Sequence, residues 1–283
     1  MKKIIFELLP KNFISQVFGI LASSRLPIWA PLFKTVFYNI FKLNLDESER
    51  SLGEYNNLQD MFTRRLKPDA REIAEDEVVS PTDGVLSQCG VFDDVSLEII
   101  QAKGKTYSLG ALLGDTELAK SFEGGMWATI YLSPFNYHRI HTAVEGEIVE
   151  AIYVPGTLWP VNEWSVEHIE KVFCVNERVT SIIKGQDNKL SALCKVGATN
   201  VGKISLSYTN DILCNTSKMK SRQSEPWHWK PQKPIRVEKS VELGCFELGS
   251  TVVIILDKSY REKYPNLFSN HQNKAVLMGQ SLL

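Results

Sequence analysis

Apolar residues recur along the first 45 positions at the spacing of helices with one apolar face. Pro10, Pro27 and Pro31 divide this region into short helical stretches. The two apolar stripes consist of Phe13, Ile14, Val17, Phe18 and Leu21, and of Leu32, Phe33, Val36, Phe37, Ile40 and Phe41. Residues 46–75 are more polar and predict a helical connector, with Leu58, Met61, Phe62 and Leu66 at helical spacing.

After residue 75 the pattern changes to short apolar runs separated by glycine, asparagine and aspartate. The expected strands cover residues 127–132, 147–154, 190–196, 203–208 and 251–256. No helical pattern alternates with these runs, which argues against a doubly wound parallel sheet. We therefore expect an α+β fold, with N-terminal amphipathic helices followed by a mostly antiparallel β core over residues 76–283.

Composition narrows the function classes for this chain of 283 residues, which is 43% apolar and 23% charged. The formal net charge of −1 indicates no nucleic-acid partner. The five cysteines are scattered without a Cys-x-x-Cys pair, so neither disulfides nor a zinc site is predicted. His138 and His141 lack a nearby cysteine or carboxylate to complete a ligand set, and we expect no metal cofactor.

The first 45 residues carry six basic side chains and one acidic side chain, Glu7. Their longest uncharged run, residues 12–24, has thirteen residues, whereas a membrane span needs about 20. Glu7, Pro10 and Lys11 interrupt the apolar region that a signal peptide requires. Two interpretations remain for residues 1–45: a helical hairpin that covers the core, or interfacial helices that lie on an anionic membrane surface.

The tetrapeptide Leu248-Gly249-Ser250-Thr251 begins the β-branched run near the C-terminus. A turn before a strand is the ordinary interpretation of such a Gly-Ser pair. It is also a bond at which a chain can cut itself, because the hydroxyl of Ser250 can attack the Gly249 carbonyl. Elimination of the resulting ester leaves dehydroalanine, which hydrolyses to a pyruvoyl group and ammonia.

Such cleavage needs a base that activates the hydroxyl, and an imidazole suits this role near neutral pH. A carboxylate on the far ring nitrogen would orient the imidazole. Asp83, in a predicted turn, could supply the carboxylate, or it could simply bond its own backbone there. His138 and His141 are three residues apart, and we expect a short helix after Ser133-Pro134 that turns both into one pocket.

Six motifs follow one another along most of the chain. They are Ser80-Pro81-Thr82-Asp83-Gly84-Val85, Tyr137-His138-Arg139-Ile140-His141, residues 156–162, Asn176-Glu177-Arg178, residues 196–202 and Leu248-Gly249-Ser250-Thr251. In this order they resemble the phosphatidylserine decarboxylases of the bacterial and mitochondrial membrane-bound type.

The resemblance implies that phosphatidylserine is decarboxylated through a Schiff base with a pyruvoyl group formed from Ser250, without pyridoxal phosphate. It implies cleavage into a β chain, residues 1–249, and an α chain, residues 250–283. His141 would be the base for cleavage beside Asp83, and His138 would deliver the proton in decarboxylation. Peripheral attachment to the cell membrane, on its cytoplasmic face, would follow.

Three rival functions share some of these features. A serine hydrolase could use Asp83, His141 and Ser250 on external substrates, although the chain lacks the Gly-x-Ser-x-Gly motif around Ser250. A non-enzymatic lipid-binding module would remain uncut. A pyruvoyl enzyme for a soluble amino acid would not need the amphipathic N-terminus. The sequence leaves open whether the chain forms a homodimer.

Overall fold

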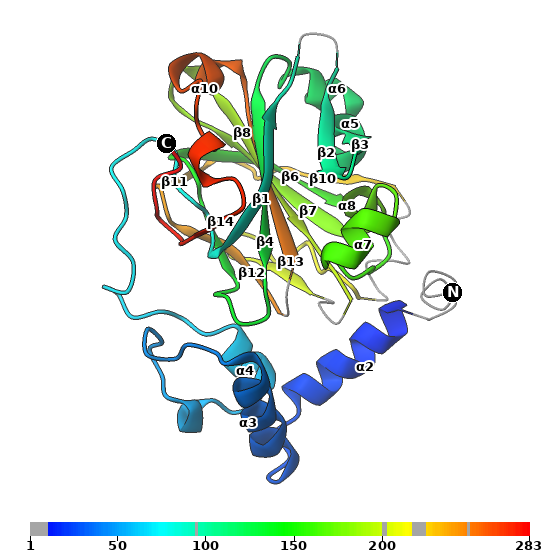
Figure 1. Cartoon of the computed structure of the whole chain (residues 1–283), viewed down its shortest axis with the longest axis vertical. Coiled ribbons are helices and arrows are strands. Elements are labelled where there is room, and N and C mark those ends of the chain that lie inside the picture. The colour runs from blue at the N-terminus through cyan, green and yellow to red at the C-terminus, as the bar shows by residue number, and fades with distance from the viewer. Residues whose placement is uncertain (1–10, 94–95, 200–202, 217–224, 248–249) are drawn as a thin grey trace.

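The computed structural model describes residues 11–93, 96–199, 203–216, 225–247 and 250–283, without the side chains of Lys11, Asn12 and Ser250. Helices lie at the N-terminal end of the chain, and an antiparallel β core follows (Figure 1). The predicted α+β class is therefore confirmed.

One large antiparallel sheet forms the centre of the core, in the order β10-β6-β7-β8-β13-β4-β1-β14, with β11 also paired to β6. Its strands are β1 (Gly84–Val91), β4 (Met126–Leu132), β6 (Gly146–Val154), β7 (Arg178–Lys184), β8 (Leu190–Val196), β10 (Trp227–Trp229), β11 (Ile235–Val237), β13 (Ser250–Leu256) and β14 (Lys274–Val276). Two smaller sheets accompany it: β5 (Arg139–His141), β12 (Glu242–Phe246) and β9 (Ile204–Leu206), and the hairpin of β2 (Glu98–Ala102) and β3 (Lys105–Ser108).

Strand β13 lies inside the large sheet, between β4 and β8. Its run of β-branched residues suits a strand that is covered on both faces, since such strands show continuous rather than alternating apolar patterns. Val252, Val253, Ile254, Ile255 and Leu256 are all buried. The pairing with β4 begins at Ser250, which lies opposite Leu132.

Short helices cover the edges of this core. They are α5 (Leu109–Leu113), α6 (Thr116–Lys120), α7 (Glu163–His168), α8 (Val172–Val175) and α10 (Lys258–Lys263), with short 3₁₀ turns η2 (Gln186–Asn188) and η3 (Ser269–His271). In Figure 1, helices α5 to α8 gather beside the β2-β3 hairpin, whereas α10 lies on the other side of the sheet. Asp115 and Asn162 cap α6 and α7, because their side chains accept hydrogen bonds from backbone N–H groups.

The N-terminal helices α2 (Lys11–Ser23), α3 (Trp29–Phe41) and α4 (Leu58–Phe62) pack together at one end of the core (Figure 1). The connector after α3 is helical only in α4 and the 3₁₀ turn η1 (Leu52–Glu54). The helical part is therefore shorter than the apolar spacing of residues 46–75 predicted. Asn57 caps α4, and past Thr63 the chain runs without regular structure to β1. Contacts with the core, such as the hydrogen bonds of Arg64 to the 135–136 turn, hold this stretch instead.

Each apolar stripe of α2 and α3 divides into two faces. Phe18, Phe33, Phe37 and Phe41 pack against the core, whereas Phe13, Ile20, Leu32 and Ile40 are exposed. Ile28, between the helices, is 84% exposed. Lys34 of α3 is buried, and its Nζ donates a hydrogen bond to the Tyr55 carbonyl oxygen at 2.6 Å. No helix in the described part of the chain has the length and apolar character that crossing a bilayer requires.

The central position of β13 predicts a large loss of stability when its side chains are shortened. Ile254→Ala should lower the free energy of unfolding by about 2–5 kcal/mol, because the buried site cannot fully collapse around alanine. Ile100→Ala, at a 45% exposed position on β2, is the matched control and should change it by about 0.5 kcal/mol or less. Urea titration measures both, and equal losses would contradict the central role of β13.

Candidate functional site

The proposed cleavage bond lies at the start of β13. Ser250 is the first residue of the strand, and its backbone lies opposite Leu132 at the end of β4. Gly249 and the side chain of Ser250 lie outside the described residues, so the bond itself is located only through its neighbours. The chain around this position is therefore the end of β4, the turn that follows it, and β8 on the other side.

The turn after β4 connects this position to His138. The side chain of Asn136 accepts a hydrogen bond from the backbone N–H of Ser133 at 2.8 Å and closes the turn. No helix follows, contrary to our expectation, because residues Arg139–His141 pair with β12 as strand β5. The two histidines consequently have different surroundings, one before the strand and one at its end.

His138 is fully buried, and its ring packs against Phe62 of α4 with 4.0 Å between ring centres. Nδ1 lies 2.8 Å from the Asn136 carbonyl oxygen, which can only accept, so Nδ1 carries the hydrogen. Burial and the nearby Arg64 guanidinium lower the pKa of His138 to about 3. The ring is therefore neutral near pH 7, and its Nε2 is a buried acceptor without a partner among the described residues.

His141 lies between Tyr137 and Ser240. Its Nδ1 faces the Ser240 carbonyl oxygen at 2.8 Å, and its Nε2 lies 3.0 Å from the Tyr137 hydroxyl, which donates to it. Burial lowers the pKa of His141, although the hydrogen bond to Ser240 and the charges of Glu242 and Asp83 oppose this shift. The imidazole is thus held in the neutral form that can accept a proton.

Asp83 is buried directly before β1. Its Oδ2 accepts a hydrogen bond from Arg71 at 2.6 Å, and its Oδ1 accepts one from the Met278 backbone N–H at 2.8 Å. The carboxylate that we predicted on the far nitrogen of His141 is therefore bonded to Arg71 instead, and the Ser240 carbonyl occupies that nitrogen. The next residue must be a glycine, Gly84, because the chain passes close to β4 there. A Cβ atom at this position would lie 2.6 Å from the Tyr131 carbonyl oxygen.

Four residues near these predicted positions were missed by sequence reasoning: Arg64, Arg71, Tyr137 and Ser240. Tyr137 and Ser240 bond His141, whereas Arg71 bonds Asp83 and, at 3.0 Å, Glu47. Arginines in a polar connector resemble ordinary surface residues, and only their burial distinguishes them. Tyr137 was inside a quoted motif, and its place beside the histidines was the one available signal.

A cavity of about 530 Å³ lies beside the start of β13, on the side of the sheet covered by α7 and the β2-β3 hairpin. Thr251, Tyr131 and Ser133 line it at the end nearest the proposed cleavage bond. Apolar side chains such as Val85, Val161 and Phe173 line it as well. The cavity therefore combines an apolar wall with hydroxyl groups next to Ser250, as ligand sites commonly do.

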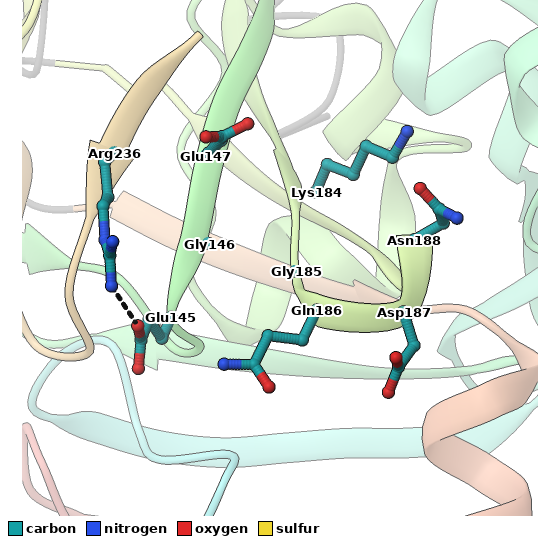
Figure 2. Close-up of a pocket in the computed structure, with 9 residues that line it drawn as sticks. All are labelled: Glu145, Gly146, Glu147, Lys184, Gly185, Gln186, Asp187, Asn188 and Arg236. Atoms are coloured by element: carbon teal, nitrogen blue, oxygen red, sulfur yellow. Dashed lines mark hydrogen bonds and ion pairs between the residues drawn. The ribbon is translucent and has the colours of Figure 1, made fainter.

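A second hollow, of about 440 Å³, is polar and lies elsewhere (Figure 2). It is lined by Gly146 and Glu147 of β6 and by Glu145 directly before that strand. Residues 184–188 and Arg236 of β11 complete the lining. Register places Lys184 and Arg178 at opposite ends of β7, roughly 20 Å apart at the usual rise per residue. Val196 of β8 lies opposite Arg178 on one side and opposite Thr251 on the other, so the Arg178 end of β7 is the end near the proposed cleavage bond. The hollow lies at the Lys184 end and is therefore far from that bond.

Metal-binding chemistry has no visible support in the described ranges, where no group of three histidine, cysteine or acidic side chains could hold an ion. Cys89, Cys174, Cys194, Cys214 and Cys245 are all free thiols.

The chain is similar to known proteins over most of its length. The family model for phosphatidylserine decarboxylase matches residues 58–283. The chain is 40% identical to a phosphatidylserine decarboxylase proenzyme from Myxococcus xanthus over 258 residues, which cover 89% of this chain and 88% of the relative. It is 39% identical to the proenzyme from Brevibacillus brevis, with 97% and 94% covered, and 37% identical to that from Shewanella loihica, with 97% and 95% covered. The chain therefore belongs to the phosphatidylserine decarboxylase family, whose members are carboxy-lyases.

Proposed function

We propose that this chain decarboxylates phosphatidylserine to phosphatidylethanolamine, with a pyruvoyl group that it makes from Ser250. Family membership supports the reaction. One observation supports the residue assignment. Ser250 begins an interior strand and lies opposite Leu132, and the turn after Leu132 contains the Asn136 carbonyl that bonds the buried His138. A neutral histidine and a serine backbone thus share one short segment of the core.

Self-cleavage begins when the Ser250 hydroxyl loses its proton and attacks the Gly249 carbonyl. The amide between them breaks as an ester forms, and elimination leaves a carboxylate on Gly249 and dehydroalanine at residue 250. Water then replaces the nitrogen, which leaves as ammonia. His141 accepts the first proton, because its depressed pKa keeps it neutral, and the charge of Asp83 favours the imidazolium that results.

After cleavage the α chain, residues 250–283, would remain in the fold without a covalent link. Strand β13 is hydrogen-bonded to β4 on one side and to β8 on the other, and β14 is bonded to β1. All three partner strands belong to the β chain, residues 1–249. The new terminus would therefore stay beside the turn that carries His138.

A pyruvoyl group at residue 250 would supply a ketone carbonyl that can bind the substrate amine and serve as the electron sink for decarboxylation. The residues present fit such a group, since Thr251 leaves a buried hydroxyl without a partner among the described residues, next to the new terminus. His138 would take up a proton on Nε2, the nitrogen that the Asn136 carbonyl leaves free, and pass that proton to the α-carbon of the substrate.

Residues 1–45 attach the enzyme to an anionic membrane surface, as a peripheral protein. The argument rests on the exposed apolar side chains of α2, α3 and the turn between them, which are Phe13, Ile20, Ile28, Leu32 and Ile40. Basic residues add attraction to the anionic cytoplasmic leaflet, although the inward turn of Lys34 removes one of them. The opposite faces cover the core, so both interpretations of this segment contribute.

Ser250→Ala should leave the chain uncut and inactive, because the hydroxyl is the attacking group. Asp83→Ala and His141→Ala should give the same full-length band on a denaturing gel, since the first removes a charge that favours the imidazolium and the second removes the proton acceptor. Ser269→Ala, an exposed serine in the same fragment, is the control and should mature normally. A fragment of residues 250–283 released from Ser250→Ala would contradict the cleavage site.

His138→Ala should separate the two reactions. It should still mature, detectable by mass and by reaction of the new terminus with a carbonyl reagent, because His141 serves the cleavage step. Turnover of phosphatidylserine should fall roughly 10²- to 10⁴-fold, the usual loss for a positioned proton-transfer group. Near-normal turnover would mean that His138 is only structural, and an uncut chain would reverse the two histidine roles.

Replacing Ile28, Leu32 and Ile40 together by serine should release the enzyme from anionic vesicles in a sedimentation assay, because the exposed apolar surface is lost. The matched control replaces Val91, Ile100 and Leu277, which are exposed apolar residues of the β core. That variant should sediment like the unchanged protein. Equal binding by both variants would refute attachment through α2 and α3.

A further inference from the structure

Arg64 presents a buried guanidinium that is only partly hydrogen-bonded. The residue follows α4 closely and is 3% exposed. Its Nη2 donates to the carbonyl oxygens of Phe135 and Asn136 at 3.0 and 3.2 Å. Its Nε and Nη1 are buried and find no acceptor among the described residues. Buried charged donors are normally satisfied, so these two N–H groups indicate a ligand that accepts from them.

The carboxylates near Arg64 are already bonded elsewhere. Asp83 and Glu47 both favour the charged form of Arg64 through space, but each is bonded to Arg71, at 2.6 and 3.0 Å. Tyr55 and Tyr137 also face Arg64, and their hydroxyl groups bond Ser48 and His141. Burial consequently lowers the pKa of Arg64, since no anionic side chain bonds it directly.

Arg64 is tied to the segment that carries the proposed chemistry. The Asn136 carbonyl oxygen accepts hydrogen bonds from both Arg64 and His138. The turn that contains Asn136 follows Leu132, which lies opposite Ser250. Arg64 and His138 are therefore linked through one carbonyl oxygen, and both side chains keep buried polar atoms without a partner among the described residues.

We propose that Arg64 binds the phosphodiester of the substrate head group through Nε and Nη1. This inference rests on the proposed decarboxylation of phosphatidylserine. The Nε–H and Nη1–H groups lie on different edges of the guanidinium, and each can donate one charge-assisted hydrogen bond to a phosphate oxygen. Binding the carboxylate instead would stabilise a group whose charge the reaction removes, and so would stabilise the ground state over the transition state. The phosphodiester keeps its charge throughout and can anchor the substrate without this penalty.

Binding an anion here has an electrostatic consequence for His138. The Arg64 charge is one of the two causes that hold the pKa of His138 low, after burial itself. A bound phosphodiester offsets that charge, so the pKa of His138 moves upward and the protonated ring becomes more accessible. Substrate binding thereby favours the form of His138 that can deliver a proton.

The test compares Arg64→Gln and Arg64→Lys with Arg65→Gln, a matched control at the adjacent, exposed arginine. Maturation is first checked on a denaturing gel, and kcat/KM is then measured on phosphatidylserine in mixed micelles. Arg64→Gln should lose roughly 10- to 100-fold in kcat/KM, the usual effect of losing charge-assisted hydrogen bonds, whereas Arg65→Gln should match the unchanged enzyme. Arg64→Lys should fall between them, because it keeps the charge without the fixed donor positions of the guanidinium.

Competition by soluble amines identifies the group that Arg64 holds. Glycerophosphoethanolamine carries the phosphodiester without a carboxylate, and serine carries the carboxylate without a phosphate. The phosphodiester compound should inhibit the unchanged enzyme more strongly than serine, and Arg64→Gln should abolish that difference. Stronger inhibition by serine that depends on Arg64 would assign the carboxylate and overturn the proposal.

Other outcomes also decide the question. Unchanged kcat/KM and unchanged inhibition in a mature Arg64→Gln would overturn the proposal and leave a buried water as the partner of Nε and Nη1. If both Arg64 variants remain uncut, the relative inhibition of the unchanged enzyme by the two amines decides alone. An unchanged enzyme that matures but does not turn over phosphatidylserine refutes the proposed function instead, independently of Arg64.

Discussion

The hydrogen bonds on both sides of β13 are the constraint on which the remaining structure depends. An interior strand of a sheet can neither slide nor tilt without breaking two ladders, and a slip of one residue would reverse every side chain. The pairing of Ser250 with Leu132 is therefore determined by the whole length of β13. The turn after Leu132 inherits that position, and with it the carbonyl that orients His138. The proposed reactive residues are thus positioned by an interior strand of the sheet and the turn opposite its first residue.

Two arginines with buried side chains, Arg71 and Arg64, lie near the proposed site and have different partners. Arg71 bonds Asp83 and Glu47, and it thereby links the irregular connector to the beginning of β1. Arg64 bonds backbone carbonyls and keeps two donors available. Removing charges from water is costly unless they are matched, so an unmatched cation is unusual in a core and is expected where an anion binds. Burial and, after it, this same charge lower the pKa of His138 and keep its ring neutral.

The N-terminal helices pack against the core with some apolar residues and expose others, whereas the sequence pattern shows a single apolar stripe on each helix. On α3 the side chains of Phe33, Phe37 and Phe41 pack against the core, and Phe37 meets Phe62 of α4 in an edge-to-face contact. Phe62 in turn packs on His138. The segment that we propose for membrane attachment is thus connected through two aromatic contacts to the proposed proton donor. Truncating the segment would consequently disturb the core as well as the surface.

Local patterns in the sequence determined much of this protein. The apolar runs at 127–132, 147–154, 190–196 and 251–256 correspond to β4, β6, β8 and β13, because the buried positions of these strands favour apolar and β-branched residues. The run at 203–208 was longer than β9, since a short edge strand has little pattern to mark its ends. Motifs also selected Asp83, His138, His141 and Ser250, whose roles remain predictions.

Only the tertiary structure decided which groups these residues meet. No spacing could show that Arg71, twelve positions away, would bond Asp83, or that the carbonyl of Ser240 would reach His141. The short helix predicted around the histidines gave way to β5, because pairing with β12 outweighed local turn preference. Hydrogen bonds between distant segments depend on how strands are ordered in the sheet. One-dimensional patterns record burial and periodicity, but they do not record that order.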